Sequence, residues 1–145
     1  MKAITIKQPW ATLIALGEKK FETRSWATKH RGPIAIHAGK QVDEDACHEP
    51  DIREALVRNN ILNISMLPTG SVIAIATIKN CIRSAETWTD GYILENGERV
   101  YSPEYEFGDF TPGRYAWELT NVVQLPQPIP TKGQQGLWNW EGVQS

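Results

Sequence analysis

The segment from Val72 to Ile78 constrains the fold of this chain more than any other part of the sequence. It reads VIAIATI, an almost continuous run of β-branched and small apolar residues. This composition is typical of a strand buried on both faces, since a half-exposed strand alternates apolar and polar residues. We therefore expect further strands on either side of it, with residues 72–78 at the centre of a barrel.

Other parts of the chain carry weaker signals for strands and helices. Period-two alternation or β-prone composition predicts five more strands. They lie at Ala3–Ile6, Lys20–Trp26, Ile34–Ala38, Tyr115–Thr120 and Leu137–Trp140. Apolar residues at helical spacing after Pro9 predict a first helix that ends at Gly17, which readily adopts the left-handed conformation. Asp43 is expected to cap a second helix, which breaks near Pro50 and resumes over residues 51–59.

Length and composition indicate one globular domain over residues 1–145. Of the 145 residues, 41% are hydrophobic and 22% are charged, which is enough to bury a core without disulfides or metals. No apolar run approaches the roughly 20 residues of a membrane-spanning helix. The first residues also lack the pattern of a signal peptide, which predicts a cytoplasmic location and no membrane partner. Cys47 and Cys81 are too few for a disulfide framework, so we expect reduced thiols.

The charges are unevenly distributed along the chain. The net charge of −2 argues against a protein that coats nucleic acid through bulk electrostatics, because such proteins are strongly basic. A basic stretch is nonetheless followed by an acidic one. The basic residues are Lys19, Lys20, Arg24, Lys29, Arg31 and Lys40, and the acidic residues are Asp43, Glu44, Asp45, Glu49, Asp51 and Glu54. This polarity predicts a local field over one cleft.

One octapeptide, Gly17 to Arg24, places ionisable residues at the start of a predicted strand. Its sequence, GEKKFETR, directly follows the predicted first helix. Glu22 and Arg24 are two residues apart and therefore lie on one face of a strand. Lys19, at the turn, reaches the same side if the strand begins with a bulge. The octapeptide therefore predicts that three ionisable groups meet at the mouth of one pocket.

This octapeptide fits the pattern GxKxxExR, and here the sequence resembles the ASCH family, the activating signal cointegrator homology domains of the PUA-like superfamily. The resemblance extends to ITIKQPW at residues 4–10 and, near the C-terminus, to residues 130–133 and 137–138. It implies an α+β fold, a PUA-like small β-barrel of about five to six strands with flanking helices. It does not extend to residues 84–112, which we expect to form a variable excursion with a hairpin turn at Asn96-Gly97.

The resemblance also implies a cleft beside the octapeptide, in a superfamily whose branches bind RNA or modified bases. Some ASCH relatives are described as ribonucleases. One bacterial branch that resembles this chain hydrolyses the acetyl amide of N4-acetylcytidine with a lysine, a threonine and a glutamate. The lysine corresponds to Lys19, but Glu22 occupies the threonine position. Thr23 is adjacent and is expected on the opposite strand face, so this mechanism is not supported, and Glu86 is only a loose match to the glutamate.

Three functions follow from these observations. The leading hypothesis is a module that binds nucleic acid, RNA rather than DNA, or a modified nucleoside, with one base or nucleotide in the cleft. The alternative is a small hydrolase, an N4-acetylcytidine-type amidohydrolase or a ribonuclease, in which Lys19 and Glu22 transfer protons. A third alternative is a protein-interaction domain that uses the excursion at residues 84–112. The sequence leaves open whether the chain is an enzyme.

The charged residues of the octapeptide each have a structural and a functional interpretation. Arg24 would form a fork of hydrogen bonds to a phosphate or a base edge. The structural alternative is an ion pair between Arg24 and Glu22 that braces the cleft wall. Lys19 would act as a base or nucleophile if desolvation and the neighbouring Lys20 lowered its pKa, and it is otherwise a surface lysine. We expect ligand contact for all three site residues.

Four residues outside the octapeptide complete the predicted ligand site. Trp26, on the same strand face as the charged pair, is expected to stack on a base. Gln8 lies beside a helix N-terminus, where it is placed to contact a base edge or an anion. His37 is either a structural histidine or an acid or base in the cleft. Lys132, in a loop with glycine, is either solvated or a phosphate contact.

No metal site is expected from the sequence. The candidate ligands are His30, His37, Cys47 and His48. No pair among them has the spacing of a known zinc site. We therefore predict neither a metal nor a cofactor.

Overall fold

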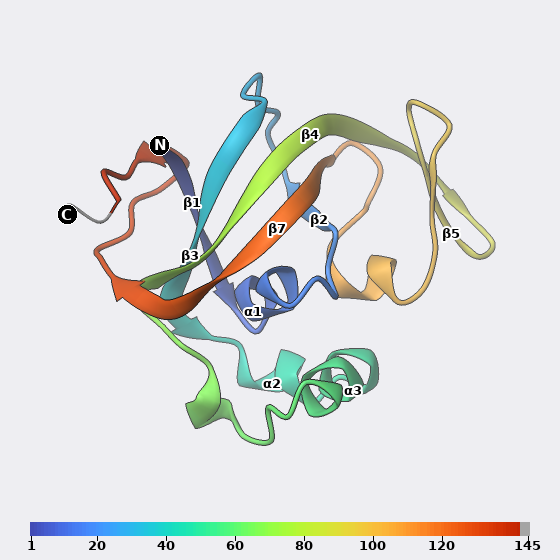
Figure 1. The fold of residues 1–145 in the computed structure, drawn as a ribbon. Coiled ribbons are helices and arrows are strands. Elements are labelled where there is room, and N and C mark those ends of the chain that lie inside the picture. Colours follow the sequence, from blue (N-terminus) through green and yellow to red (C-terminus); the bar gives the residue numbers. More distant parts are fainter. Residues whose placement is uncertain (143–145) are drawn as a thin grey trace.

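The computed structural model of the protein describes residues 1–142 and consists of a curved sheet with short helices packed against it (Figure 1). The strands are β1 (Lys2–Gln8), β2 (Phe21–Arg24), β3 (Gly32–Val42), β4 (Ser71–Trp88), β5 (Gly91–Leu94), β6 (Arg99–Val100), β7 (Tyr115–Pro130) and β8 (Leu137–Asn139). The helices are α1 (Trp10–Ala15), α2 (Glu44–Cys47) and α3 (Pro50–Arg58), with 3₁₀ turns η1 (Ile64–Met66) and η2 (Glu104–Phe107). No helix in the described part of the chain is long and apolar enough to cross a membrane.

β4 is the central strand of the main sheet. The strand order is β2-β7-β4-β3-β1-β8, in which only β1 and β3 run parallel. β4 therefore pairs with β3 on one side and with β7 on the other. Val72, Ala74, Ala76 and Ile78 are all at most 1% exposed. The central position predicted for residues 72–78 is confirmed, although they form only the first part of a strand of 18 residues.

The sheet is open, so the predicted barrel of five to six strands is wrong in closure and in number. All six predicted strands form, and β5 and β6 from the excursion raise the number to eight. The end strands β2 and β8 have four and three residues and do not pair with each other. The outer edge of β2 meets the side chain of Glu104 instead. That carboxylate accepts hydrogen bonds from Lys20 N at 2.9 Å and from Phe21 N at 3.2 Å, which satisfies edge groups without another strand.

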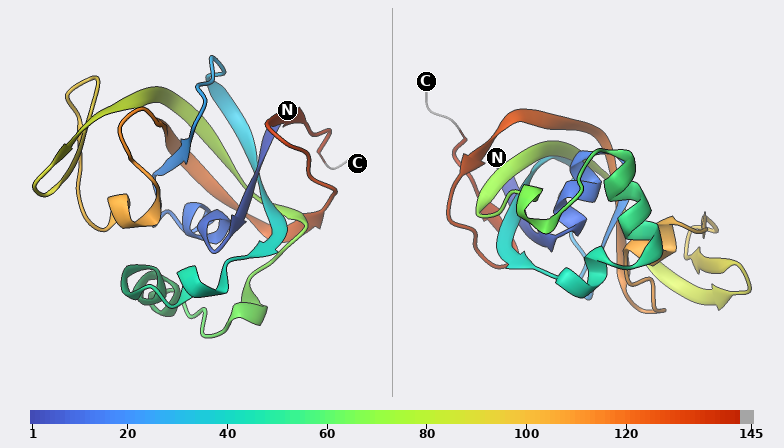
Figure 2. Two further views of the ribbon diagram at one scale, coloured as in Figure 1. Left: turned by 180° about the vertical axis from the view of Figure 1, so that it is seen from behind. Right: turned by 90° about the horizontal axis from the view of Figure 1, so that it is seen from below.

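The excursion extends the sheet and then returns to it (Figures 1 and 2). The far half of β4 pairs with β5, and β5 turns into β6. Gly97 has a φ of 88°, which confirms the hairpin turn predicted at Asn96-Gly97. This region has a small core of its own, formed with β2 and β7 by Phe21, Ile82, Leu94, Val100, Phe110 and Ala116. After β6 the chain passes through η2 and comes back to β2.

α1 packs between the sheet and α3 (Figure 2). Ile14 belongs to the core under the sheet, whereas Leu13 packs with Ile52 and Leu56 of α3. Gly17 has a φ of 78° and ends the helix as predicted. The tight exit leads the chain directly into β2, and this fixes where the octapeptide begins.

Candidate functional site

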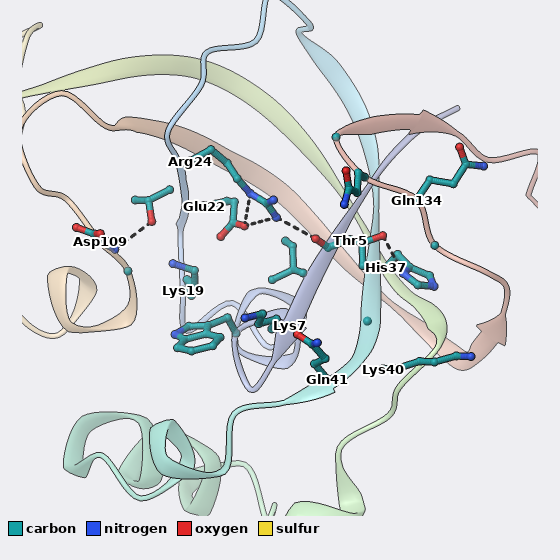
Figure 3. A pocket seen from close by; sticks show the side chains of 18 of the residues that line it. Thr5, Lys7, Lys19, Glu22, Arg24, His37, Lys40, Gln41, Asp109 and Gln134 are labelled. Carbon is teal, nitrogen blue, oxygen red and sulfur yellow. Dashed lines mark hydrogen bonds and ion pairs between the residues drawn. The ribbon is translucent and has the colours of Figure 1, made fainter.

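A cleft of about 1150 Å³ lies along β1, β2 and β3 and two loops (Figure 3). We call residues 19–26 together with residues 106–109 of the excursion the first wall. We call the cleft-lining parts of β1 and β3, together with the loop of residues 131–136 after β7, the second wall. The predicted site residues that line this cleft are Lys19, Glu22, Arg24, Trp26, His37 and Lys132.

Lys19 is buried in the first wall. Its side chain is 1% exposed, and its Nζ donates a hydrogen bond to the carbonyl oxygen of Phe107 at 2.7 Å. Burial lowers the pKa of Lys19, because the charged form loses water, while the negative charges of Glu22 and Glu104 oppose this shift. The residue is therefore not a surface lysine, and its amine is suited to proton transfer.

Glu22 and Arg24 form an ion pair that joins β2 to β1 (Figure 3). The Nε and Nη2 atoms of Arg24 lie 2.9 and 2.8 Å from Glu22 Oε2, and Nη2 also donates to the carbonyl oxygen of Thr5 at 2.9 Å. The side chains of Arg24 and Glu22 are 25% and 10% exposed. Within residues 1–142, Arg24 Nη1 and Glu22 Oε1 have no protein partner. The pair thus braces the cleft and still leaves one donor and one acceptor for a ligand.

The excursion supplies part of the first wall, a contact that no sequence signal indicated. Glu104 binds the backbone amides of Lys20 and Phe21, although it lies 84 residues from Lys20. Burial raises the pKa of the Glu104 carboxyl, and the nearby charge of Lys19 opposes the rise. Lys19 in turn reaches the Phe107 carbonyl. The octapeptide is therefore held in place by Glu104 and Phe107 of the excursion, a segment that lies within the part of the chain matching the family described below.

Thr23 also lines the cleft, contrary to the expectation that it points away from it. β2 is an edge strand, and Glu22, Thr23 and Arg24 all line the cavity, so side chains from both of its faces reach it. Thr23 Oγ1 accepts a hydrogen bond from Asp109 N at 3.0 Å. A Cβ atom placed on Gly108 would lie 3.0 Å from Lys19 Nζ and 3.1 Å from Thr23 Oγ1. The amine and the hydroxyl therefore both lie beside Gly108, although Glu22 still occupies the position of the threonine in the lysine–threonine–glutamate mechanism.

Two tryptophans line the cleft. Trp26, a predicted site residue, is half-buried and meets Trp117 edge-on, with ring centroids 4.9 Å apart and an interplanar angle of 84°. Trp10, the first residue of α1, contacts two hydrophobic clusters and also lines the cleft. The cleft thus has aromatic surface at two places.

His37 fastens the second wall to β1. Its Nε2 lies 2.8 Å from the carbonyl oxygen of Thr131, and its Nδ1 lies 3.1 Å from Thr5 Oγ1. Trp138 Nε1 donates to the same hydroxyl oxygen at 3.2 Å. Because a carbonyl oxygen can only accept, the network assigns the ring proton to Nε2 and lets Thr5 donate to Nδ1. Both nitrogens are used inside the protein, as the structural alternative for His37 requires.

Gly133 packs directly on this histidine. A Cβ atom at position 133 would lie 2.6 Å from His37 Cε1 and 2.6 Å from Thr5 Oγ1, closer than real carbon contacts allow. Any other residue would therefore push the loop away from β1 and β3. The sequence analysed alone places this glycine in a loop but does not reveal the close contact.

Three exposed lysines lie along the second wall. Lys7 comes from β1, Lys40 from β3 and Lys132 from the loop. Within the described residues, none of the three forms an ion pair, whereas Arg114 beside the first wall lies 3.5 Å from Asp109. Lys7 and Lys40 were not predicted as site residues, because only the register of β1 on β3 brings them to the cleft. The second wall therefore presents uncompensated positive charge.

Gln8 and Glu86 lie outside the cleft. Gln8 is fully buried, and its Nε2 donates to the carbonyl oxygen of Pro68 at 2.7 Å. Its Oε1 accepts from Thr12 N at 2.9 Å, so the amide fixes the start of α1 and has no free group for a ligand. Glu86 is exposed on the far half of β4, opposite Ile93 of β5. Neither residue is carried into the proposals below.

A group of carboxylates near the cleft was also missed. In the part of the chain that the structure describes, ligand atoms of Glu49, Asp51 and Glu106 lie within 4.8 Å of one another. Acidic side chains often gather in this way on a surface without a metal, so the absence of a metal stays a prediction. Cys47 and Cys81 are both free.

An open sheet with a cleft beside an edge strand is the fold of a known class of domains. Residues 4–129 match the ASCH domain family, and the chain is therefore a member of that family. Over 138 residues it is 31% identical to activating signal cointegrator 1 of mouse and 30% identical to the human protein. These alignments cover 93% of this chain but 21% of each relative, so the chain spans about a fifth of their length.

Solved structures of an ASCH protein from Zymomonas mobilis share the fold. The structure of that protein has a TM-score of 0.56 and 16% identity, covering 97% of this chain and 87% of that chain. The structure of a serine-to-alanine mutant of the same protein has a TM-score of 0.56 and 17% identity, and the match covers 97% of this chain and 88% of that chain. At this level of identity the likeness concerns the fold alone, and it supports the predicted ASCH fold without the barrel closure.

Proposed function

We propose that this chain binds RNA, or a modified nucleoside, by taking one base into the cleft between the two walls. The observation that carries the proposal is the ion pair of Arg24 and Glu22. The pair holds a free donor, Arg24 Nη1, beside a free acceptor, Glu22 Oε1. The bond from Arg24 to the Thr5 carbonyl fixes this arrangement before a ligand arrives, which reduces the entropy lost on binding.

A donor beside an acceptor complements the edge of a base. Adenine and cytosine each carry an amino donor, and adenine presents an acceptor nitrogen next to it. RNA-binding proteins read such edges on unstacked bases of single strands. A phosphate at the same place would satisfy Arg24 but would face the carboxylate of Glu22. The first wall is therefore better matched to a base than to a phosphate.

The remaining surface of the cleft supports the same class of ligand. Trp26 and Trp10 provide ring surface on which a base can stack, a contact that contributes about 1–3 kcal/mol per base in single-strand binders. The unpaired lysines of the second wall make the cleft locally positive, although the whole chain has a net charge of −2. Such focusing attracts an anionic ligand to one place on an otherwise acidic protein.

The test is a titration of short labelled RNA oligomers and of free nucleosides, repeated over a salt series. The variants are Arg24→Ala and, as a matched control, Arg53→Ala, whose side chain is exposed on α3 and does not line the cleft. We expect Arg24→Ala to lose at least about tenfold in affinity at every salt concentration, the effect of a lost charge-assisted hydrogen bond. Equal affinities for the two variants would remove the proposal.

A second proposal, a hydrolase that uses the same cleft, is supported by Thr23 beside Lys19. Hydrolysis of an acetyl amide adds water across the C–N bond and releases acetate and an amine. Thr23 Oγ1 would attack the acetyl carbonyl while Lys19, with its lowered pKa, accepts the hydroxyl proton and returns it to the leaving nitrogen; a water molecule would then hydrolyse the acetyl-threonine ester, releasing acetate and restoring the hydroxyl. Glu22 would assist this proton transfer. A ribonuclease would use the same two groups on a phosphodiester.

Turnover distinguishes the hydrolase from the binding module. The protein is incubated with N4-acetylcytidine and with RNA, and products are separated by chromatography. We expect a hydrolase to lose turnover in Lys19→Met and to keep it in Lys79→Met, which changes an exposed lysine of β4 outside the cleft. Absence of product from both substrates contradicts the hydrolase and leaves the binding proposal in place.

A further inference from the structure

The second wall contains a loop whose backbone amides are unused. Within residues 1–142, the amides of residues 132–135 donate no hydrogen bond to the protein, whereas Thr131 N donates to the carbonyl oxygen of Gly70 at 3.0 Å. Lys132, Gln134 and Gln135 are exposed and Gly133 is half-buried, so these amides are open to water and available to an external acceptor beside the cleft. Free backbone N–H groups beside a cleft can donate hydrogen bonds to an anion.

The start of the loop is held at Thr131 and Gly133, so the amides next to these residues are set before a ligand binds. His37 bonds to the Thr131 carbonyl at 2.8 Å, and Gly133 packs against the histidine ring with no room for a side chain. Thr5 and Trp138 fix the histidine in turn. A backbone anion site needs this order, because its affinity comes from several donors that point to one place.

Charge on the second wall favours an anion as well. Lys7, Lys40 and Lys132 line it without ion pairs among the described residues. The acidic residues that line the cleft lie on the first wall, and they are Glu22, Glu106 and Asp109. The second wall is therefore the part of the cleft whose charged residues are all positive.

The cleft is also larger than a single base requires. Its volume of about 1150 Å³ is above the range of about 300–1,000 Å³ typical of small-molecule sites. Thr5 connects the two walls, since its carbonyl holds Arg24 and its hydroxyl holds His37. Lys7 lies two residues further along β1, about 7 Å from Thr5 at the usual rise of a strand. A ligand with its base at Arg24 thus extends toward the lysines.

We infer that the second wall is a phosphate subsite, in which the amides of residues 132–135 and the amines of Lys7, Lys40 and Lys132 bind a nucleotide phosphate. The inference rests on the proposed function and adds a ligand preference to it: a nucleotide or strand binds more tightly than the free nucleoside. His37 is a positioning residue for this subsite, because it acts through the loop.

The experiment compares probes with and without a phosphate by calorimetric titration. The probes are cytidine, its 3′- and 5′-monophosphates and the dinucleotide CpC, with the corresponding adenosine set in parallel. We expect the phosphate-bearing probes to bind at least about tenfold more tightly than the nucleosides. Tighter binding of the dinucleotide than of either monophosphate identifies an internal phosphodiester as the natural group. In ¹⁵N–¹H spectra, the amides of residues 132–135 are expected to shift with phosphate-bearing probes only.

Two variants locate the phosphate. The double substitution Lys40→Ala with Lys132→Ala changes exposed side chains, and Gly133→Ala displaces the loop from His37. Both are expected to lose the tenfold preference for phosphate-bearing probes over nucleosides, whereas Lys79→Ala keeps it. A phosphate preference that survives in both variants overturns the assignment, because the phosphate then binds elsewhere.

The outcomes for the wild type separate this inference from the proposed function. If nucleosides and nucleotides bind equally and Arg24→Ala weakens both, the phosphate subsite is refuted and base binding stands. If no probe binds, the proposed function fails and the subsite fails with it. If nucleotides bind preferentially and the loop amides shift, both are supported.

Discussion

The two walls of the cleft present charge in opposite ways. On the first wall, Lys19 is buried against a carbonyl and Arg24 is paired with Glu22, so each group has a fixed direction. On the second wall, Lys7 and Lys40 are exposed and unpaired within the described residues. A fixed, partly desolvated group discriminates between ligands, whereas a mobile surface charge attracts anions and is weakened by salt. Under the proposed function, the first wall selects the ligand and the second wall attracts it.

The largest effect is expected when β2 loses its hydrogen bonds to Glu104 of the excursion. Glu104→Gln replaces one acceptor oxygen with a donor, which leaves Lys20 N or Phe21 N without a partner. We expect a loss of about 2–3 kcal/mol in the free energy of unfolding, the usual penalty for an unsatisfied group that had a charged partner. Urea denaturation measures it, with Glu98→Gln on the exposed β5–β6 turn as control. Equal stabilities would mean that the excursion does not support the wall.

The buried amine of Lys19 predicts a dependence of stability on pH. Burial lowers the pKa of Lys19 below its ordinary value of 10.5. At a pH above the lowered pKa of the folded chain and below 10.5, Lys19 is protonated in the unfolded chain but neutral in the folded chain. The free energy of unfolding therefore rises with pH over this range. Urea denaturation from neutral pH upward is expected to show this rise in the wild type. Lys19→Met should lack it, and parallel curves for the two proteins would contradict a desolvated amine.

A smaller effect is expected from neutralising the acid that orients Arg24. Glu22→Gln keeps the shape of the side chain but weakens its bonds to Arg24, so ligand affinity should fall by about 1–2 kcal/mol. The loss is expected to be similar at low and high salt, because the pair is mostly shielded from solvent. Calorimetric titration at two salt concentrations measures it, with Glu54→Gln on exposed α3 as control. A loss confined to low salt would mean that Glu22 acts only through long-range charge.

The smallest effect is expected from a single lysine of the second wall. Lys7→Ala should lower ligand affinity by less than about 1 kcal/mol at low salt, with no difference at high salt, as for other exposed charges. Lys79→Ala, outside the cleft, is the matched control. If the loss for Lys7→Ala persists at high salt, Lys7 makes a fixed contact and the two walls do not differ as described.

Most of the sheet could be predicted because its signals are local. The apolar run at residues 72–78 identified the central strand, and Gly17 marked the end of α1. β5 and β6 could not be predicted beyond their turn, since strands of four and two residues are too short to show a periodicity. Closure was predicted wrongly, because whether end strands pair depends on contacts between distant segments. That residues 1–145 form one cytoplasmic domain stays a prediction.

The site could be predicted only where its residues are close together in the sequence. Spacing within the octapeptide is enough to place Glu22 and Arg24 on one strand face, and the cleft also contains Lys19. Glu104 could not be found, because it meets the octapeptide only after the excursion has folded back. Gln8 shows the opposite error, since a residue was predicted as a ligand contact and is not one. A polar residue beside a helix N-terminus can bind an anion, but here Gln8 Oε1 accepts the hydrogen bond of a backbone amide of the helix, Thr12 N.

The length of β4 has a consequence for how quickly a ligand enters. Gly70, next to its first residue, anchors the loop of the second wall through the amide of Thr131. Its last residues, up to Trp88, carry the hairpin that leads on to the first wall. A single continuous strand therefore spaces both sides of the cleft, with no flexible joint between them. Association is expected to follow one exponential phase, at a rate set by diffusion and electrostatic steering without a slow opening step.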